Sequence, residues 1–139
     1  MGAYGTTYQT NEFDAEILRS GDFQLISITL DSTATLDAVT KIPKGTLVTK
    51  STDLSDGTYN VVSTAANFLA ATITQYMKDA VVLAETILDA SDGDQVVKAY
   101  WAGTFDLTKL TYSNKSSVAI TKAQFAENQR LTIVDGPIA

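Results

Sequence analysis

The stretch that decides the fold is residues 79–106, DAVVLAETILDASDGDQVVKAYWAGTFD. Two apolar, β-prone runs, Ala80–Leu88 and Gln95–Phe105, flank an Asp/Gly-rich turn at Asp89–Asp94. Runs of this kind separated by turn residues predict two strands joined as a hairpin. Gly103, inside the second run, predicts a bulge or the close approach of another backbone. Nothing in the stretch is a catalytic motif.

Further segments to either side also have the pattern of strands. Residues 23–30 alternate loosely between apolar and polar side chains. Thr46–Lys50 and Thr58–Val62 predict a second hairpin, with a tight turn at Ser55-Asp56-Gly57. A last short strand is predicted at Leu131–Val134.

Helix is predicted with good signals at one place, Thr121–Arg130, where Thr121 and Gln124 have the spacing of a capping box. The segment Ser63–Met77 fits two interpretations: a short helix, or a loop followed by a strand. A loop or one to two helical turns with a strand from Thr72 is favoured. The predicted fold class is therefore mainly β (α+β): a small β-rich domain with one or two short helices and an extended N-terminal arm.

The first 22 residues differ from the rest of the chain. They are polar and turn-rich, so we interpret 1–22 as the arm and 23–139 as a single β-rich domain. Ordering some twenty residues costs roughly 20–40 kcal/mol of backbone entropy, whereas about six large apolar groups contribute only about 10–15 kcal/mol when buried. We therefore expect the arm to become ordered only if its backbone also pairs with something, such as the edge strand of a partner.

The composition argues against several classes of function. A net charge of −6 with only ten Lys and Arg residues is unsuited to nucleic-acid binding, which needs clustered basic side chains. The chain has no Cys and no His, so it lacks disulfides, thiolate metal sites and the commonest general base. No apolar run approaches the length of a membrane span, and the first residues lack the features of a secretory signal.

The acidic residues invite two chemical interpretations. Asp89, Asp92 and Asp94 suggest calcium, but counting from Asp89 the EF-hand ligand positions are occupied by Ser91, Gly93 and Tyr100, so the pattern fails. Asp and Gly are what a hairpin turn needs in any case. Paired carboxylates could drive glycoside hydrolysis, and the candidates are Glu85, Asp89 and Asp106. With 16 acids in 139 residues, some proximity is expected by chance.

Other catalytic and ligand-binding patterns are missing from the sequence. There is no G-x-S-x-G, no histidine to activate a serine, and no glycine-rich phosphate loop. Tyr100 and Trp101 suggest a sugar-stacking platform, but one of two adjacent strand residues must face inward. Trp101 is better explained as a core or interface residue. We expect no enzyme activity, no cofactor and no metal site.

A series of short motifs gives the chain a family resemblance. Taken in order, they resemble the head decoration (capsid cement) proteins of tailed bacteriophages, over roughly residues 42–134. Val82 departs from the family pattern, in which a glycine is frequent at that place. The motifs are Lys44-Gly45-Thr46-Leu47-Val48, Ala80-Val81-Val82-Leu83, Asp89–Asp94, Val97-Lys98-Ala99 with Gly103-Thr104-Phe105, and Ala126–Val134.

The resemblance implies a virion protein on the outer capsid surface, made in the host cytoplasm. Such proteins sit, usually as trimers, at threefold and quasi-threefold positions of the expanded capsid and hold major capsid protein subunits against the pressure of packaged DNA. The expected partners are the major capsid protein and two further copies of the chain, with no nucleic acid and no membrane. The capsid-contact candidates are Tyr4, Tyr8, Phe13, Ile17 and Leu18, and the trimer-interface candidates are Trp101, Phe105, Pro137 and Ile138.

Two other functions stay open from the sequence. One is a different phage structural component, such as a tail or head–tail connector protein with a similar small β-fold. The other is a carbohydrate- or metal-binding module, which would respond to sugars or Ca²⁺ with a thermal shift.

Overall fold

The structure is a computed structural model and describes residues 23–50, 57–64 and 77–135. Several predictions fall outside these ranges: the arm at 1–22, most of the turn at 55–57, the segment 65–76 with its predicted strand from Thr72, and the C-terminal residues from 136 onward.

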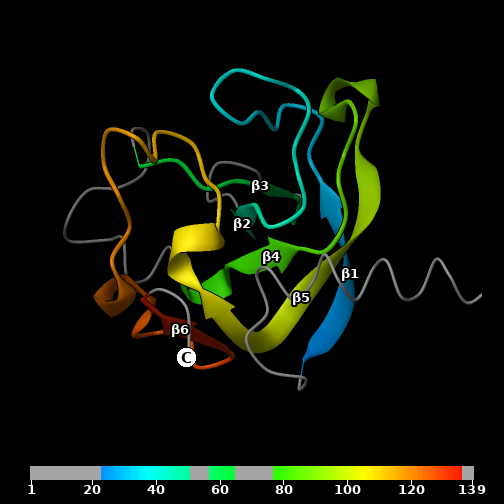
Figure 1. Cartoon of the computed structure of the whole chain (residues 1–139). Helices are drawn as coiled ribbons and strands as arrows, with labels where there is room; N and C mark the ends of the chain where they lie inside the picture. Colours follow the sequence, from blue (N-terminus) through cyan, green and yellow to red (C-terminus); the bar gives the residue numbers. More distant parts are fainter. Residues whose placement is uncertain (1–22, 51–56, 65–76, 136–139) are drawn as a thin grey trace, which may run out of the picture.

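The described chain is a small β-barrel, which confirms the predicted mainly-β fold class (Figure 1). Its short helical elements are single 3₁₀ turns of three or four residues. The strands are β1 (Gln24–Leu30), β2 (Leu47–Lys50), β3 (Tyr59–Val61), β4 (Val81–Leu83), β5 (Gln95–Asp106) and β6 (Leu131–Val134). The 3₁₀ turns are η1 (Met77–Asp79), η2 (Ala90–Asp92), η3 (Leu107–Lys109) and η4 (Lys122–Phe125).

The sheet has the strand order β1-β3-β2-β4-β5-β6, and an additional β1–β5 pairing closes the first five of these strands into the barrel. β1 runs antiparallel to β5 along its whole length, from Gln24 opposite Ala102 to Leu30 opposite Gln95. The other closing contact is short, a parallel pair between Leu30 and Tyr59 of β3. β6 continues the sheet by pairing in parallel with the second half of β5.

The central strands are buried on both faces, because the sheet lies between two apolar cores. Along β4, Val81 and Leu83 point into the barrel core and Val82 points into the C-terminal core, and all three are fully buried. β2 divides its side chains in the same way, Leu47 to the C-terminal core and Val48 to the barrel core. The barrel core also includes Ile28, Leu30, Ile42, Tyr59, Val61, Ile87, Val97 and Ala99. The C-terminal core also includes Val62, Met77, Tyr100, Phe105, Leu110, Tyr112, Ile120, Phe125, Leu131 and Ile133.

The predicted hairpins are confirmed as antiparallel strand pairs, with one correction. β2 pairs with β3 (Val48 opposite Val61), and β4 pairs with β5 (Val82 opposite Tyr100). The predicted strand Ala80–Leu88 is too long, because β4 ends at Leu83. The chain then leaves β5, and Ile87 forms a separate antiparallel bridge with Ile42, with N···O distances of 2.7 and 2.9 Å.

Of the two alternatives predicted for Gly103, a bulge or the close approach of another backbone, the structure has the close approach, and β5 has a bulge two residues earlier. Between Gln24 and Leu25 of β1 the facing residue of β5 moves from Ala102 to Tyr100, so the additional residue is Trp101. Gly103 has the predicted close approach, since its N–H donates to the carbonyl of Arg130 at 3.2 Å where β6 begins. Its φ of 153° is in the range that favours glycine.

The predicted helix Thr121–Arg130 is wrong beyond its first turn. The start is as expected, because Gln124 Oε1 accepts a hydrogen bond from Thr121 N–H at 2.8 Å. η4 ends at Phe125, however, and Asn128 is buried with all its amide atoms engaged. Its Nδ2 donates to the carbonyls of Met77 and Ala80, both at 3.1 Å, and its Oδ1 accepts from Leu131 N–H at 3.2 Å. These bonds hold the chain in a turn that leads into β6.

We predict that Asn128→Ala lowers the free energy of unfolding by about 2–4 kcal/mol. The substitution leaves the buried N–H of Leu131 without an acceptor, at a cost of about 1–3 kcal/mol. It also removes one of two donors from the carbonyls of Met77 and Ala80, which keep their bonds from Ala80 N–H and Arg130 Nη2. Urea denaturation followed by circular dichroism measures the loss. The exposed neighbour provides a matched control, because Glu127→Ala should change stability by less than about 0.5 kcal/mol. Equal effects of the two substitutions would contradict the assigned role of Asn128.

A strained two-residue turn lies between β1 and β2. Leu36 and Val39 exchange both backbone hydrogen bonds, at 2.8 and 2.9 Å, and the residues between them have positive φ, 49° at Asp37 and 68° at Ala38. This is the geometry of a type I′ turn, which prefers Asn, Asp or Gly. Asp37 tolerates it and also accepts from Asn114 N–H at 2.8 Å, whereas the methyl group of Ala38 is unfavourable there.

Ala38→Gly should therefore stabilise the protein by about 0.5–1 kcal/mol, since relief of the left-handed strain exceeds the added entropy of the unfolded chain. Gly57→Ala is the reciprocal test. Gly57 has a φ of 82° and no heavy atom within 4 Å of the position a Cβ would take, so its backbone alone should make the substitution destabilising. Thermal melts of both variants give the two signs, and a lower melting temperature for Ala38→Gly would refute the strain.

Candidate interaction site

The acidic residues singled out from the sequence serve the local backbone. Asp89 Oδ1 accepts from Ser91 N–H at 3.0 Å and from Ser91 Oγ at 2.6 Å, and these bonds lower the pKa of Asp89. Glu85 Oε2 accepts from Lys98 N–H at 2.7 Å, and Asp106 Oδ1 accepts from Thr108 N–H at 2.9 Å. Within residues 23–50, 57–64 and 77–135 there is no group of three His, Cys, Asp or Glu side chains suited to a metal ion.

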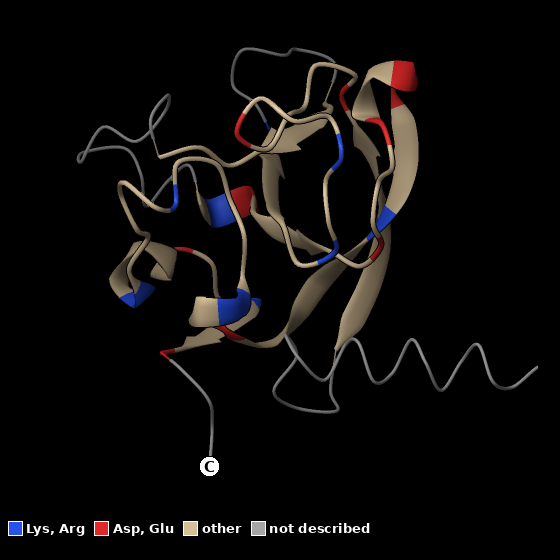
Figure 2. Cartoon of the chain, turned by 45° about the horizontal axis from the view of Figure 1, so that its top comes forward, with Lys and Arg blue, Asp and Glu red and all other residues tan. Residues whose placement is uncertain are grey.

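Two further findings concern the positions of the charged residues and the length and apolar character of the helices. In Figure 2 the lysine and arginine positions are dispersed over loops, 3₁₀ turns and strands, and acidic positions are likewise spread over the chain, with several of them at the end of the barrel that carries η2. No helix in the described part of the chain is long and apolar enough to cross a bilayer.

Trp101, at the bulge of β5, is partly buried against the barrel core and lies under the side chain of Arg130. The guanidinium carbon lies 3.6 Å from the centre of the indole ring, which is the geometry of a cation–π contact. Nη1 of Arg130 donates to the carbonyl of Trp101 itself at 2.6 Å. Nη2 donates to the carbonyls of Lys78 at 2.9 Å and Ala80 at 3.2 Å. Partial burial lowers the pKa of Arg130.

This arrangement decides what Trp101 can offer a partner. The indole is only partly buried, and Arg130 covers one of its faces, so that face is closed to a sugar ring or to a second copy of the chain. Arg130 at the same time ties the beginning of β6 to η1 and β5, since its three carbonyl partners come from those two regions.

Phe105 is a correction among the trimer-interface candidates. Its side chain has no exposed surface, lies in the C-terminal core and contacts the ring of Tyr100 with 5.6 Å between ring centres. It is therefore a core residue and has no side-chain surface to offer a second copy of the chain. Pro137, Ile138 and the capsid-contact candidates Tyr4, Tyr8, Phe13, Ile17 and Leu18 lie outside the described residues.

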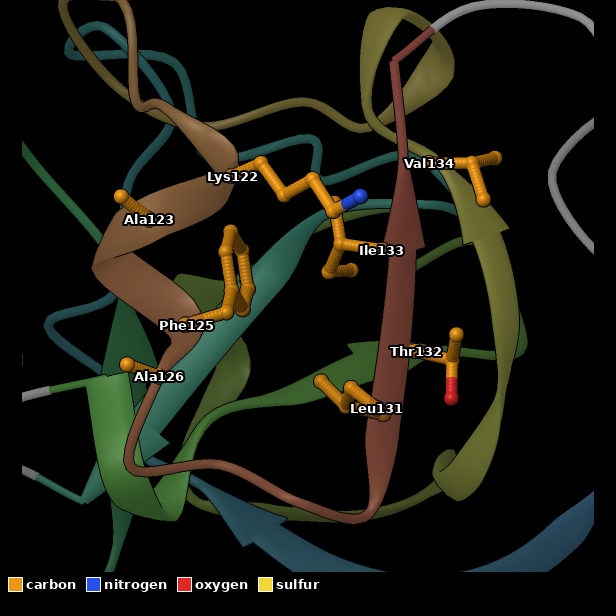
Figure 3. Close-up of a pocket in the computed structure, with 8 residues that line it drawn as sticks. All are labelled: Lys122, Ala123, Phe125, Ala126, Leu131, Thr132, Ile133 and Val134. Atoms are coloured by element: carbon orange, nitrogen blue, oxygen red, sulfur yellow. The ribbon is translucent and has the colours of Figure 1, made fainter.

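An open groove of about 620 Å³ lies between η4 and β6 (Figure 3). Phe125 projects from η4 toward Leu131 and Ile133 of β6, and Ala123 and Ala126 line the η4 side. Lys122 is the one charged side chain among the lining residues, and it reaches across toward Ile133. The groove is thus a mainly apolar depression with a single positive charge.

The groove follows the outer edge of the sheet. In the described chain β6 pairs with β5 alone, and it ends the strand order. Gly103 N–H donates to Arg130 O, and successive strand residues alternate in the direction of their backbone groups. The N–H and C=O of Ile133 consequently point away from β5. Backbone groups that point outward from an edge strand are a template for another extended chain.

A second apolar surface lies at Phe23, the residue that precedes β1. Phe23 meets Tyr100 edge-on with ring centres 5.3 Å apart, and Phe23 and Leu25 are 45% and 46% exposed. Because Gln24 faces Ala102 and Leu131 faces Gly103, this entry point and the start of β6 lie beside adjacent residues of β5.

Sequence reasoning missed the residues that define this region, namely Arg130, Asn128 and the η4–β6 groove. Asn128 had a usable signal, because asparagine is unfavourable inside helices and common where they end. Arg130 had no local signal, since its three carbonyl partners are 29 to 52 residues away in the sequence. The groove depends on where η4 stops, which the predicted helix obscured.

No protein-family model and no curated protein matches this chain.

We predict that Arg130→Lys destabilises the protein by about 1–3 kcal/mol, because an ammonium group cannot stack on the indole and reach three carbonyls together. Trp101 is the sole tryptophan, so its fluorescence reports the contact directly. We expect a shifted emission maximum and more efficient acrylamide quenching in the variant. Lys109→Ala, on η3, should leave the emission unchanged. Unaltered emission in Arg130→Lys would show that the stacking does not persist in solution.

Proposed function

We propose that this protein is a structural virion component that decorates the outer surface of an expanded phage capsid. In this role it binds the major capsid protein, as trimers at threefold and quasi-threefold positions, and stabilises the head against internal DNA pressure. The observation that carries the proposal is the ordered series of motifs that resembles capsid decoration proteins, spread over residues 42–134.

The proposal is supported by the places of four of the five motifs, which lie in the barrel strands and in the turns that join them. Gly45, with a φ of 92°, turns the chain into β2, and Ala80–Leu83 forms the doubly buried β4. The acidic motif forms η2, and the two phrases around Lys98 and Gly103 form the two halves of β5. These four motifs are thus residues on which this barrel depends, as expected of a shared fold.

The arm supports the same proposal from a different direction. Residues 1–22 precede Phe23, whose exposed ring and the neighbouring Leu25 form an apolar surface at the base of the arm. An extended segment that adds to a strand of another protein gains main-chain hydrogen bonds as well as apolar contacts. Three such arms on a trimer would raise the apparent affinity by effective concentration. Tyr4, Tyr8, Phe13, Ile17 and Leu18 are the residues we assign to this contact.

Cosedimentation with phage heads tests the proposal. The purified protein should bind saturably to expanded, undecorated heads and should not bind unexpanded proheads, because expansion creates the threefold docking surface. Absence of binding to both particles would overturn the proposal and favour a tail or connector component. A thermal shift with sugars or Ca²⁺ would instead favour the ligand-binding module.

Variants of the arm separate docking from folding. Deletion of residues 1–20 should abolish decoration while the barrel, which begins at β1, keeps its circular dichroism spectrum. The full-length variant Tyr4→Ser/Tyr8→Ser should weaken binding at least tenfold, and Thr6→Ser/Thr7→Ser is its matched control. Full decoration by the deletion variant would exclude the arm as the capsid contact.

A further inference from the structure

The η4–β6 groove has the features of a site for one added strand. It is open, mainly apolar and bordered by the outer backbone edge of β6, where the N–H and C=O of Ile133 point away from β5. Its apolar wall consists of Phe125, Leu131 and Ile133, which are only 3–5% exposed, and of the exposed Ala123 and Ala126 of η4 (Figure 3). A strand added here would present every second side chain to that wall.

The chain itself contains a segment that matches this site. Residues 12–18 read EFDAEIL, in which Phe13, Ala15 and Ile17 alternate with Glu12, Asp14 and Glu16. In an extended conformation one face of the segment is apolar and the other is acidic. The small Ala15 between two large residues suits a wall whose middle is occupied by the ring of Phe125.

We propose that residues 12–18 of the arm dock as an additional strand on the β6 edge of their own chain, with Phe13 and Ile17 in the η4–β6 groove. Reach permits this. Residues 19–22 can span about 14 Å, and neighbouring strands are about 4.8 Å apart, so the groove is within reach of a chain that enters beside Ala102.

The tether favours the chain's own arm over that of a second copy. A segment attached through a short linker has an effective concentration in the millimolar range, which exceeds the protein concentration in a dilute sample. The docking needs no capsid, so it holds whether or not the chain decorates one. If it does, Phe13 and Ile17 exchange the groove for the capsid when the protein binds.

Engineered disulfides test the docking in the full-length protein, which has no cysteine of its own. Ala15→Cys is combined with Ala126→Cys or, separately, with Ala123→Cys, both exposed positions on the groove. A bond forms only when the Cα atoms come within about 7 Å. In a glutathione buffer at micromolar protein we expect at least one pair to form an intramolecular disulfide at least tenfold more than the control pair Thr6→Cys/Ala126→Cys.

Hydrogen exchange gives a readout without cysteines. The amide of Ile133 should exchange at least fivefold faster in the full-length variant Phe13→Ser/Ile17→Ser than in the unaltered chain, and Tyr4→Ser/Tyr8→Ser should leave the rate unchanged. Equal disulfide yields from positions 6 and 15, or disulfides formed only between chains, would overturn the proposal. An Ile133 amide that is indifferent to Phe13 and Ile17 would do the same.

Discussion

The rest of the structure depends on the burial of β4 and β2 on both faces. A strand with one wet face alternates apolar and polar residues, whereas Val81, Val82 and Leu83 are all buried, because successive side chains enter different cores. This requires a layer of chain outside the barrel. The segment from Leu107 to Val134 supplies that layer, and its residues Leu110, Tyr112, Ile120 and Phe125 cover the outer side chains of the sheet.

Regular structure contributes little to holding that outer segment. Its 3₁₀ turns are short, and its pairing outside β6 consists of isolated bridges such as Thr46 with Thr111. Hydrogen bonds from polar side chains hold this segment where a regular strand would use backbone hydrogen bonds. Tyr112 Oη accepts from Ile120 N–H at 2.8 Å, Asn128 joins η1 to β6, and Arg130 joins β6 to β5. Each of these bonds is buried or partly buried, where an unsatisfied backbone group is costly.

These two features explain which parts of the fold could be predicted. β1, β2, β3 and β5 follow from residues whose apolar pattern and turn neighbours agree with their structure, and the antiparallel partners were correct. The length of β4, the place of the bulge at Trp101 and the end of the helix at Phe125 depend on contacts with distant residues. Phe105 was assigned to a surface because nothing local distinguishes an exposed aromatic residue from one that belongs to a second core. For the candidate site, the sequence predicted the N-terminal arm but not the η4–β6 groove.

The outer edge of β6 makes this fold prone to association with other extended chains. A barrel removes most strand edges, but β6 pairs on one side only within the described chain, and an apolar groove runs beside it. Such an edge favours association with any extended chain, including other copies. An arm whose segment 12–18 fits the groove would cover the edge and still remain exchangeable, since a seven-residue strand gains little over its ordering cost. A stronger partner for the same residues would then release the edge at the moment of binding, which couples occupation of the arm to exposure of β6.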